Sequence, residues 1–152
     1  MPDRIIIPTR LIVPGDRRIL PNFTADEFWC KCGCHALNLD PETAMHLQYF
    51  RTDIHPAIVN IHSACRCVPW NRHEGGEEDS YHICTIEHPT QAFDFDVKEL
   101  RAGKWIMWSA EYTMQMLDKF DTTKFFRGRG ICKFKGWIHV DSRKTAMETW
   151  NY

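Results

Sequence analysis

The sequence lacks a long hydrophobic run, and it lacks an excess of charge of either sign. The apolar stretch after Arg4 is interrupted at Pro8, Arg10 and Pro14, which leaves it too short for a signal sequence or a membrane span. The formal net charge of -1 gives no general attraction for nucleic acid or anionic lipid. We therefore expect a chain made in the cytoplasm without a signal peptide, with no nucleic-acid partner and no membrane span.

Repeats, low-complexity tracts and long linkers are also absent, so nothing in the sequence divides the chain. Its 152 residues suffice for one domain with a buried core but not for two substantial ones. The hydrophobic fraction of 43% and the charged fraction of 26% are those of an ordinary globular protein. The sequence predicts a single domain over residues 1–152.

Complete pairing of the cysteines into disulfides is excluded, because their number, seven, is odd. In an extended segment, Cys30, Cys32 and Cys34 would place their sulfurs on one face, and Cys65 and Cys67 would share a face for the same reason. Four thiolates around zinc form a closed, structural site. A second, structural Zn2+ at Cys30, Cys32, Cys34 and Cys67 is therefore one hypothesis, and a disulfide or buried free thiols are the alternatives.

Two segments carry signals for helices. Asp40 can cap a helix over residues 40–51, because Pro41 suits the first helical position. Ser109 can cap a second helix over residues 109–120. The buried stripe expected on this second helix consists of Tyr112, Met116 and Phe120.

The remaining periodic segments are typical of strands. Residues 57–63 form a short β-branched run, and residues 92–97 alternate so that Asp94 and Asp96 lie on one face. Residues 130–140 resemble a hairpin. We expect an α+β fold with a small, mainly antiparallel sheet and helices packed on it.

Three motifs stand apart from core-building patterns: Ser80-Tyr81-His82, Ala92-Phe93-Asp94 and Trp137-Ile138-His139-Val140-Asp141. Taken singly, each is more often a loop or core feature. Together, two histidines and an aspartate match a catalytic zinc site, which keeps three protein ligands and leaves one position open to water. His88 and Asp96 remain alternatives to the histidine and aspartate of the first two motifs.

The order of these motifs resembles the zinc D-Ala-D-Ala carboxypeptidase and L-Ala-D-Glu endopeptidase family of peptidoglycan peptidases, which includes phage endolysins. The resemblance covers residues 22–143, and residues 1–21 form an amino-terminal extension. Residues 22–34 resemble the family's amino-terminal segment, residues 40–51 its first long helix, and residues 63–67 its Ser-Gly-Tyr-Arg-Cys motif. Its zinc-binding motifs correspond to Ser80-Tyr81-His82, Ala92-Phe93-Asp94 and His139-Val140-Asp141.

The resemblance implies the hedgehog/D-Ala-D-Ala peptidase-like fold and one catalytic Zn2+ held by His82, Asp94 and His139. The implied substrate is the stem peptide of bacterial peptidoglycan, cut by an endopeptidase or a D,D-carboxypeptidase. In a chain without a signal peptide, this favours a phage lysin that acts on the cell wall after release, or a virion-associated protein. It would then be a monomer or a virion component.

Four further residues are expected around the zinc. Arg66 matches the family's arginine, and its guanidinium could bind a substrate carboxylate or carbonyl oxygen in two places. Ser80 and Trp137 are also candidates for contact with substrate. Asp141 could orient His139 or take part in proton transfer.

The chain departs from the family pattern in two places. Residues 83–91 form a longer stretch than usual and lack its glycine, which we interpret as an insertion at the rim. Gly136 and Trp137 stand where many relatives carry an acidic residue or a histidine that acts as the general base. Candidate bases elsewhere are Asp141, His88, Glu87 and Asp96. The alternative function is therefore a catalytically weak or inactive zinc-binding structural or virion module with the same fold.

Overall fold

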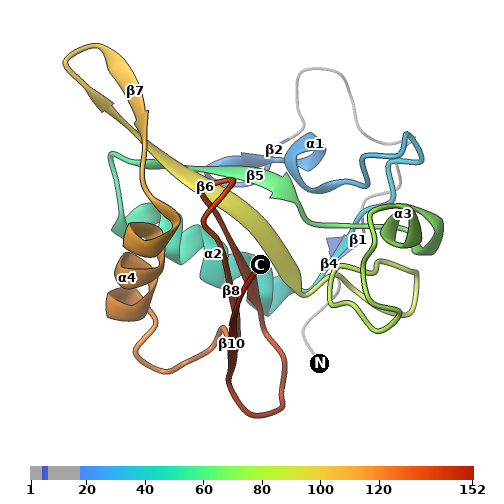
Figure 1. The fold of residues 1–152 in the computed structure, drawn as a ribbon. Coiled ribbons are helices and arrows are strands. Elements are labelled where there is room, and N and C mark those ends of the chain that lie inside the picture. The colour runs from blue at the N-terminus through green and yellow to red at the C-terminus, as the bar shows by residue number, and fades with distance from the viewer. Residues whose placement is uncertain (1–4, 7–17) are drawn as a thin grey trace.

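The computed structural model describes residues 5–6 and 18–152 and places a six-stranded sheet at the centre of the molecule (Figure 1). The strand order is β10-β8-β9-β6-β5, and β7 forms a long hairpin with the end of β6. The bounds of these strands are β5 Ile58–Ser63, β6 Ala92–Arg101, β7 Lys104–Met107, β8 Gly128–Cys132, β9 Trp137–Asp141 and β10 Glu148–Asn151. Two small antiparallel sheets pair β1 (Ile5–Ile6) with β4 (Asn38–Leu39) and β2 (Arg18–Leu20) with β3 (Phe23–Thr24).

The main sheet is mixed, which corrects part of the expected fold. The α+β class agrees with the structure, and the hairpin expected over residues 130–140 is β8 and β9. However, β10 runs parallel to β8, so the description of a small, mainly antiparallel sheet is incomplete. Gly128 pairs with both Asp141 and Glu148, so β10 begins at the end of the sheet where β9 finishes. The short connection after β9 crosses to the other side of β8, so β10 runs in the same direction as β8.

The described residues also form four helices: α1 Ala25–Phe28, α2 Pro41–Asp53, α3 Val68–His73 and α4 Ala110–Phe120. The predicted start of α2 is confirmed, because the Asp40 carboxylate accepts a hydrogen bond from the backbone N–H of Thr43. Ser109 caps α4 in the same way. In the part of the chain that the structure describes, no helix is long and apolar enough to cross a bilayer.

The buried stripe predicted for α4 is wrong. Tyr112 is 42% exposed, and Met116 and Phe120 are only partly buried. The helix instead buries residues at spacings of three, four and seven, which is the usual pattern of a core-facing helix. These residues are Ala110, Thr113, Met114 and Leu117.

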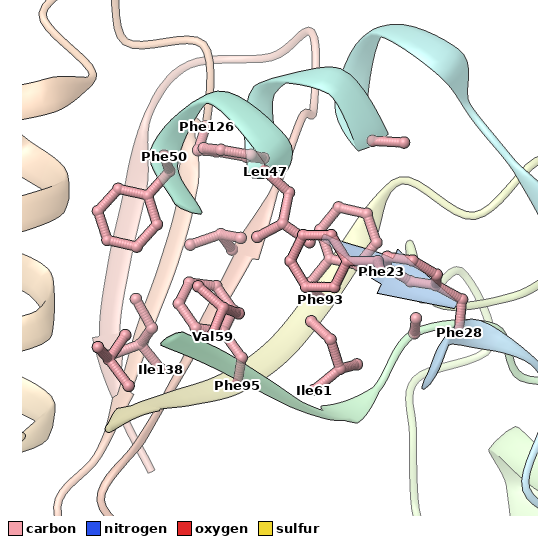
Figure 2. Packing of buried hydrophobic residues seen from close by; sticks show 14 of the residues in the cluster. Phe23, Phe28, Leu47, Phe50, Val59, Ile61, Phe93, Phe95, Phe126 and Ile138 are labelled. Atoms are coloured by element: carbon pink, nitrogen blue, oxygen red, sulfur yellow. The ribbon is translucent and has the colours of Figure 1, made fainter. Parts of the chain in front are cut away.

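The core lies between α2 and one face of the main sheet (Figure 2). Leu47 and Phe50 of α2 are fully buried over Phe93 and Phe95 of β6. Because neighbouring side chains of a strand point to opposite faces, the aspartates that alternate with these phenylalanines lie on the other face of the sheet. That face, turned away from α2, carries the polar residues described next.

Candidate metal centre

His82, Asp94 and His139 come together on this polar face. Asp94 of β6 is the direct strand partner of His139 of β9. His82 lies in the loop after α3, where its backbone carbonyl accepts a hydrogen bond from the N–H of Arg66. Asp94 Oδ1 lies 2.8 Å from His139 Nδ1 and 3.2 Å from His82 Nε2, and the two histidine nitrogens are 3.3 Å apart. Three donor atoms from distant parts of the sequence thus converge on one point.

The other nitrogen of each histidine ring is held by an acceptor. His82 Nδ1 lies 2.8 Å from the carbonyl oxygen of Ala64, and His139 Nε2 lies 2.8 Å from Asp141 Oδ2. A ring that donates through one nitrogen keeps a lone pair on the other. Both lone pairs are therefore directed at the point where Asp94 also presents its oxygen, an arrangement common to metal-binding histidines.

This donor set fits a zinc ion. Ligand atoms bound at about 2.0–2.1 Å around a tetrahedral zinc are separated by about 3.3 Å, and the three donor atoms here are 2.8–3.3 Å apart. Among residues 5–6 and 18–152, His82, Asp94 and His139 are the histidine and carboxylate group whose donor atoms approach closely enough for one ion. Two nitrogens and one oxygen also leave a position for water.

The two alternative ligands lie elsewhere. His88 is exposed in the loop of residues 83–91, where its backbone N–H is bonded to Thr85 Oγ1. Asp96 shares a face with Asp94 but is bonded through Oδ2 to His62 of β5. The geometry therefore groups neither residue with the three donor atoms.

Electrostatics keep the carboxylates of the centre ionised. Burial raises the pKa of Asp94, but the charges of His82 and His139 outweigh burial and hold it well below its usual range. Burial lowers the pKa of His139, but the hydrogen bonds that its ring donates to Asp141 and Asp94 outweigh burial and raise the pKa to about 9. Burial also raises the pKa of Asp141, but Arg143 and His139 bring it down to about 2. Without a metal, a proton on His139 supplies the positive charge between these carboxylates, and a bound metal ion would replace that proton and take up the ring's lone pair.

Asp141 is fully buried, and both of its carboxylate oxygens accept hydrogen bonds. Oδ2 contacts His139, and the guanidinium of Arg143 donates from Nε to Oδ1 at 2.7 Å and from Nη2 to Oδ2 at 2.8 Å. Of the two roles considered from the sequence, this geometry supports the orientation of His139. Sequence reasoning missed Arg143, although its spacing of two from Asp141 in an extended segment was a usable signal.

Arg66 lies against the metal centre. Its Nη2 donates to Asp94 Oδ2 at 3.2 Å, and its Nε donates to Ser63 Oγ at 2.9 Å. Nη1 reaches the side-chain oxygen of Asn71 at 3.4 Å. The guanidinium thus holds the Asp94 oxygen that does not face the histidines, and it stays partly exposed at 15%.

A cavity of about 450 Å³ opens beside the centre. Its wall includes His139, Ser80, Tyr81 and Trp150, together with Glu77 and Asp79 of an acidic turn. Ser80 therefore lies beside the centre, and its contact with substrate stays a prediction. A larger cavity of about 650 Å³ shares Ser80 and Tyr81 but contains none of the three candidate ligands.

Trp137 does not line either cavity. Its ring stacks on His62 with centroids 3.9 Å apart. His62 contacts the buried carboxylate of Asp96, which also accepts a hydrogen bond from the side chain of Asn60 at 3.1 Å. This polar row on β5 escaped the sequence analysis, although alternation within residues 57–63 places Asn60 and His62 on one face.

A second cluster gathers Cys30, Cys32, Cys34 and Cys67. Residues 31–34 form turns, so the condition of an extended segment is not met there, and the sulfurs of Cys30, Cys32 and Cys34 converge through the turns instead. Cys65 is buried and does not belong to the cluster. A backbone hydrogen bond from Cys34 is the largest influence on Cys32 and helps to lower its pKa to about 7. Burial raises the pKa of Cys30 to about 12.

The model of a family described as Peptidase M15 matches residues 21–141, which is more than half of the chain and spans all three candidate ligands. No curated protein and no solved structure matches the chain.

Proposed function

The chain belongs to the peptidase M15 family of metallopeptidases, and from this premise we propose that it hydrolyses peptide bonds in the stem peptides of bacterial peptidoglycan. His82, Asp94 and His139 would hold one Zn2+. The observation that carries the proposal is the convergence of three donor atoms within 3.3 Å while the outer nitrogen of each histidine is held by an acceptor. Histidines that bind metals almost always hold their other ring nitrogen in this way.

Bound zinc would lower the pKa of a water molecule toward neutrality and polarise the scissile carbonyl. The residues of the chain prepare the site for this chemistry. The Ala64 carbonyl and the Asp141 carboxylate fix the tautomers of His82 and His139, so that both lone pairs face inward. Arg66 binds the outer oxygen of Asp94, which leaves the inner oxygen for the ion.

Substrate would enter the cavity beside His139. Ser80 Oγ already accepts the backbone N–H of His82 at 3.2 Å, so its hydroxyl hydrogen is available to a substrate carbonyl. Arg66 lines neither cavity, but its guanidinium is partly exposed, and its bonds to Asp94, Ser63 and Asn71 leave N–H hydrogens that could bind a substrate carboxylate. These two groups would orient the stem peptide.

Proton transfer requires a group that the sequence analysis did not identify. Asp141 is fully committed to His139 and Arg143, and Asp96 is bonded to His62 and Asn60. His88 and Glu87 line the other cavity. Glu77 and Asp79 are exposed carboxylates on the wall of the cavity that contains His139, so they lie on the side from which substrate would enter. We assign the base to this turn.

The test is mass analysis of purified peptidoglycan fragments incubated with the protein. We expect one defined cleavage that stops with a chelator and returns with zinc, and that is lost in His82→Ala. The matched control is His88→Ala, which removes an exposed histidine from the same loop and should cleave normally. If the fragments stay intact although the protein is fully loaded with zinc, the proposed peptidase activity is refuted.

One observation favours a second function. Gly136 and Trp137 offer no base before His139, and Asp141 is occupied. A zinc-binding module that holds stem peptides without cutting them would show zinc-dependent binding and no products in the same experiment. The Glu77→Gln and Asp79→Asn variants separate the two functions. If either variant still binds stem peptides but no longer cleaves them, the substituted carboxylate is the general base and the protein is a peptidase. For either function we propose action at the cell wall after release, or on a virion.

A further inference from the structure

The four cysteines of the second cluster have the spacing of a tetrahedral thiolate site. The sulfur of Cys30 lies 3.5 Å from that of Cys32 and 3.6 Å from that of Cys67, and Cys32 and Cys67 are 3.6 Å apart. The sulfur of Cys34 lies within 4.8 Å of the other three. Thiolates bound at about 2.3 Å around a tetrahedral zinc are separated by about 3.8 Å.

Disulfide bonding does not explain this cluster. A disulfide joins two sulfurs at about 2.05 Å, whereas all seven cysteines are free and three sulfurs here are nearly equidistant. A dry core of thiols does not explain it either, because Cys32 and Cys34 are exposed. Four converging sulfurs, two of them exposed, are instead the arrangement of a tetrahedral thiolate metal site.

The local backbone is shaped around the sulfurs. Gly33 has a φ of +100°, which suits glycine, and this turn brings Cys32 and Cys34 back toward each other. The backbone N–H of Cys67 points at the sulfur of Cys30 at 3.4 Å. Such a donor stabilises negative charge on sulfur, as a bound thiolate requires.

The cluster adjoins the chain segment that supports the metal centre. Within residues 64–67, the Ala64 carbonyl holds the ring of His82, and the backbone of Arg66 bonds to both His82 and Cys84 at 2.9 and 2.8 Å. The side chain of Arg66 holds Asp94. Cys67 ends this segment, so anything that fixes its sulfur also fixes the support of the other site.

We propose that Cys30, Cys32, Cys34 and Cys67 bind a structural zinc ion. This ion would anchor residues 64–67, which hold His82 through the Ala64 carbonyl and Asp94 through the Arg66 side chain. The site is closed, with four protein ligands, so it would stabilise the fold and take no part in hydrolysis. Binding replaces the thiol protons with zinc and releases them to solvent. This inference does not depend on the proposed peptidase activity.

The first test is the metal content of the purified full chain. We expect about two zinc ions per chain in the wild type and about one in Cys32→Ala, which alters an exposed residue. The control Cys132→Ala removes a buried thiol from β8 and should keep both ions. His82→Ala should also lose one ion, but from the other site, so the two sites are counted separately. An unchanged zinc content in Cys32→Ala would overturn the proposal.

The second test needs no cysteine variant. Cobalt exchanged into the wild type and into His82→Ala should give intense thiolate-to-cobalt charge-transfer bands in both, because the thiolate site is intact in each. A mercurial reagent that blocks thiols should release one of the two zinc ions from the wild type. Absence of the bands, or a Cys32–Cys67 disulfide in protein purified with zinc and without oxidant, would refute the thiolate site.

The anchoring role has its own readout. In Cys32→Ala we expect faster hydrogen exchange at the amides of Arg66 and Cys84, which close the two bonds of this segment. We also expect about tenfold weaker zinc binding at the histidine site. Unchanged exchange at both amides, in a variant that has lost one zinc, would leave no anchoring role for the ion.

Discussion

His139 and Asp141 of β9 are joined side chain to side chain, with His139 Nε2 2.8 Å from Asp141 Oδ2. Residues two apart on a strand point to the same face, so the pair is set by the strand itself. Arg143 holds the far side of the carboxylate through two further bonds. The position of the candidate metal ligand therefore depends on a buried carboxylate that cannot rotate.

We predict that Asp141→Asn weakens zinc binding about tenfold to hundredfold, because the neutral amide orients and polarises His139 less well. Competition with a chromogenic chelator measures this affinity. Arg143→Gln is the control, since it keeps the carboxylate and removes only its outer support, and it should have a smaller effect. Equal affinities in Asp141→Asn and the wild type would show that Asp141 does not position His139.

Arg66→Lys should lower kcat/KM on peptidoglycan fragments about tenfold to hundredfold while zinc content stays unchanged. Lysine keeps the charge but cannot bind Asp94, Ser63 and Asn71 at once from a planar fork. Steady-state kinetics beside metal analysis check both parts. The comparison variant is Arg72→Lys, which makes the same exchange on the exposed surface of α3. If Arg66→Lys loses zinc as well, its main role is to support Asp94 rather than to bind substrate.

The start of a helix and the face of a strand on which a side chain lies could be predicted, because both depend on residues that are close together in the sequence. The Asp40 cap and Pro41 define the start of α2, and alternation in β6 places Asp94 on the polar face. These signals lie within a few residues of the feature they predict. The resemblance supplied the rest, since no local pattern connects His82 with His139.

Other features depend on contacts between distant segments and left no local signal. The parallel pairing of β10 with β8 follows from where β9 ends, so Trp150 could not be placed near His139 beforehand. The exposed Tyr112 was expected to be buried because spacing alone does not say which side of α4 meets the sheet. His62 was overlooked because its partner, Asp96, is 34 residues away.

Gly128→Ala should displace Asp141 and destabilise the protein. A Cβ at Gly128 would overlap the Asp141 carboxylate, which is fully buried and pinned by Arg143. We expect the free energy of unfolding to fall by about 1–3 kcal/mol, together with weaker zinc binding. Urea denaturation and chelator competition measure the two effects.

Gly130→Ala is the matched control on the same strand. Its Cβ would lie 2.6 Å from Trp150 Nε1, but Trp150 is only partly buried on the edge strand and can move. We therefore expect Gly130→Ala to keep its zinc affinity. Equal loss of zinc affinity in the two variants would mean that the overlap with Asp141 has no special effect on the centre.

Arg129→Met should cost about 3–5 kcal/mol of unfolding free energy, because it leaves a buried carboxylate without its charge partner. Arg129 and Asp121 are 3% and 1% exposed and lie 2.7 Å apart, and Arg129 Nε also donates to the Phe126 carbonyl at 2.7 Å. The control is Arg127→Met, which removes an exposed arginine two residues away and should change stability by less than about 0.5 kcal/mol. Urea denaturation of the zinc-saturated proteins compares the two. Similar midpoints for both variants would show that water reaches the Asp121 carboxylate once Arg129 is gone.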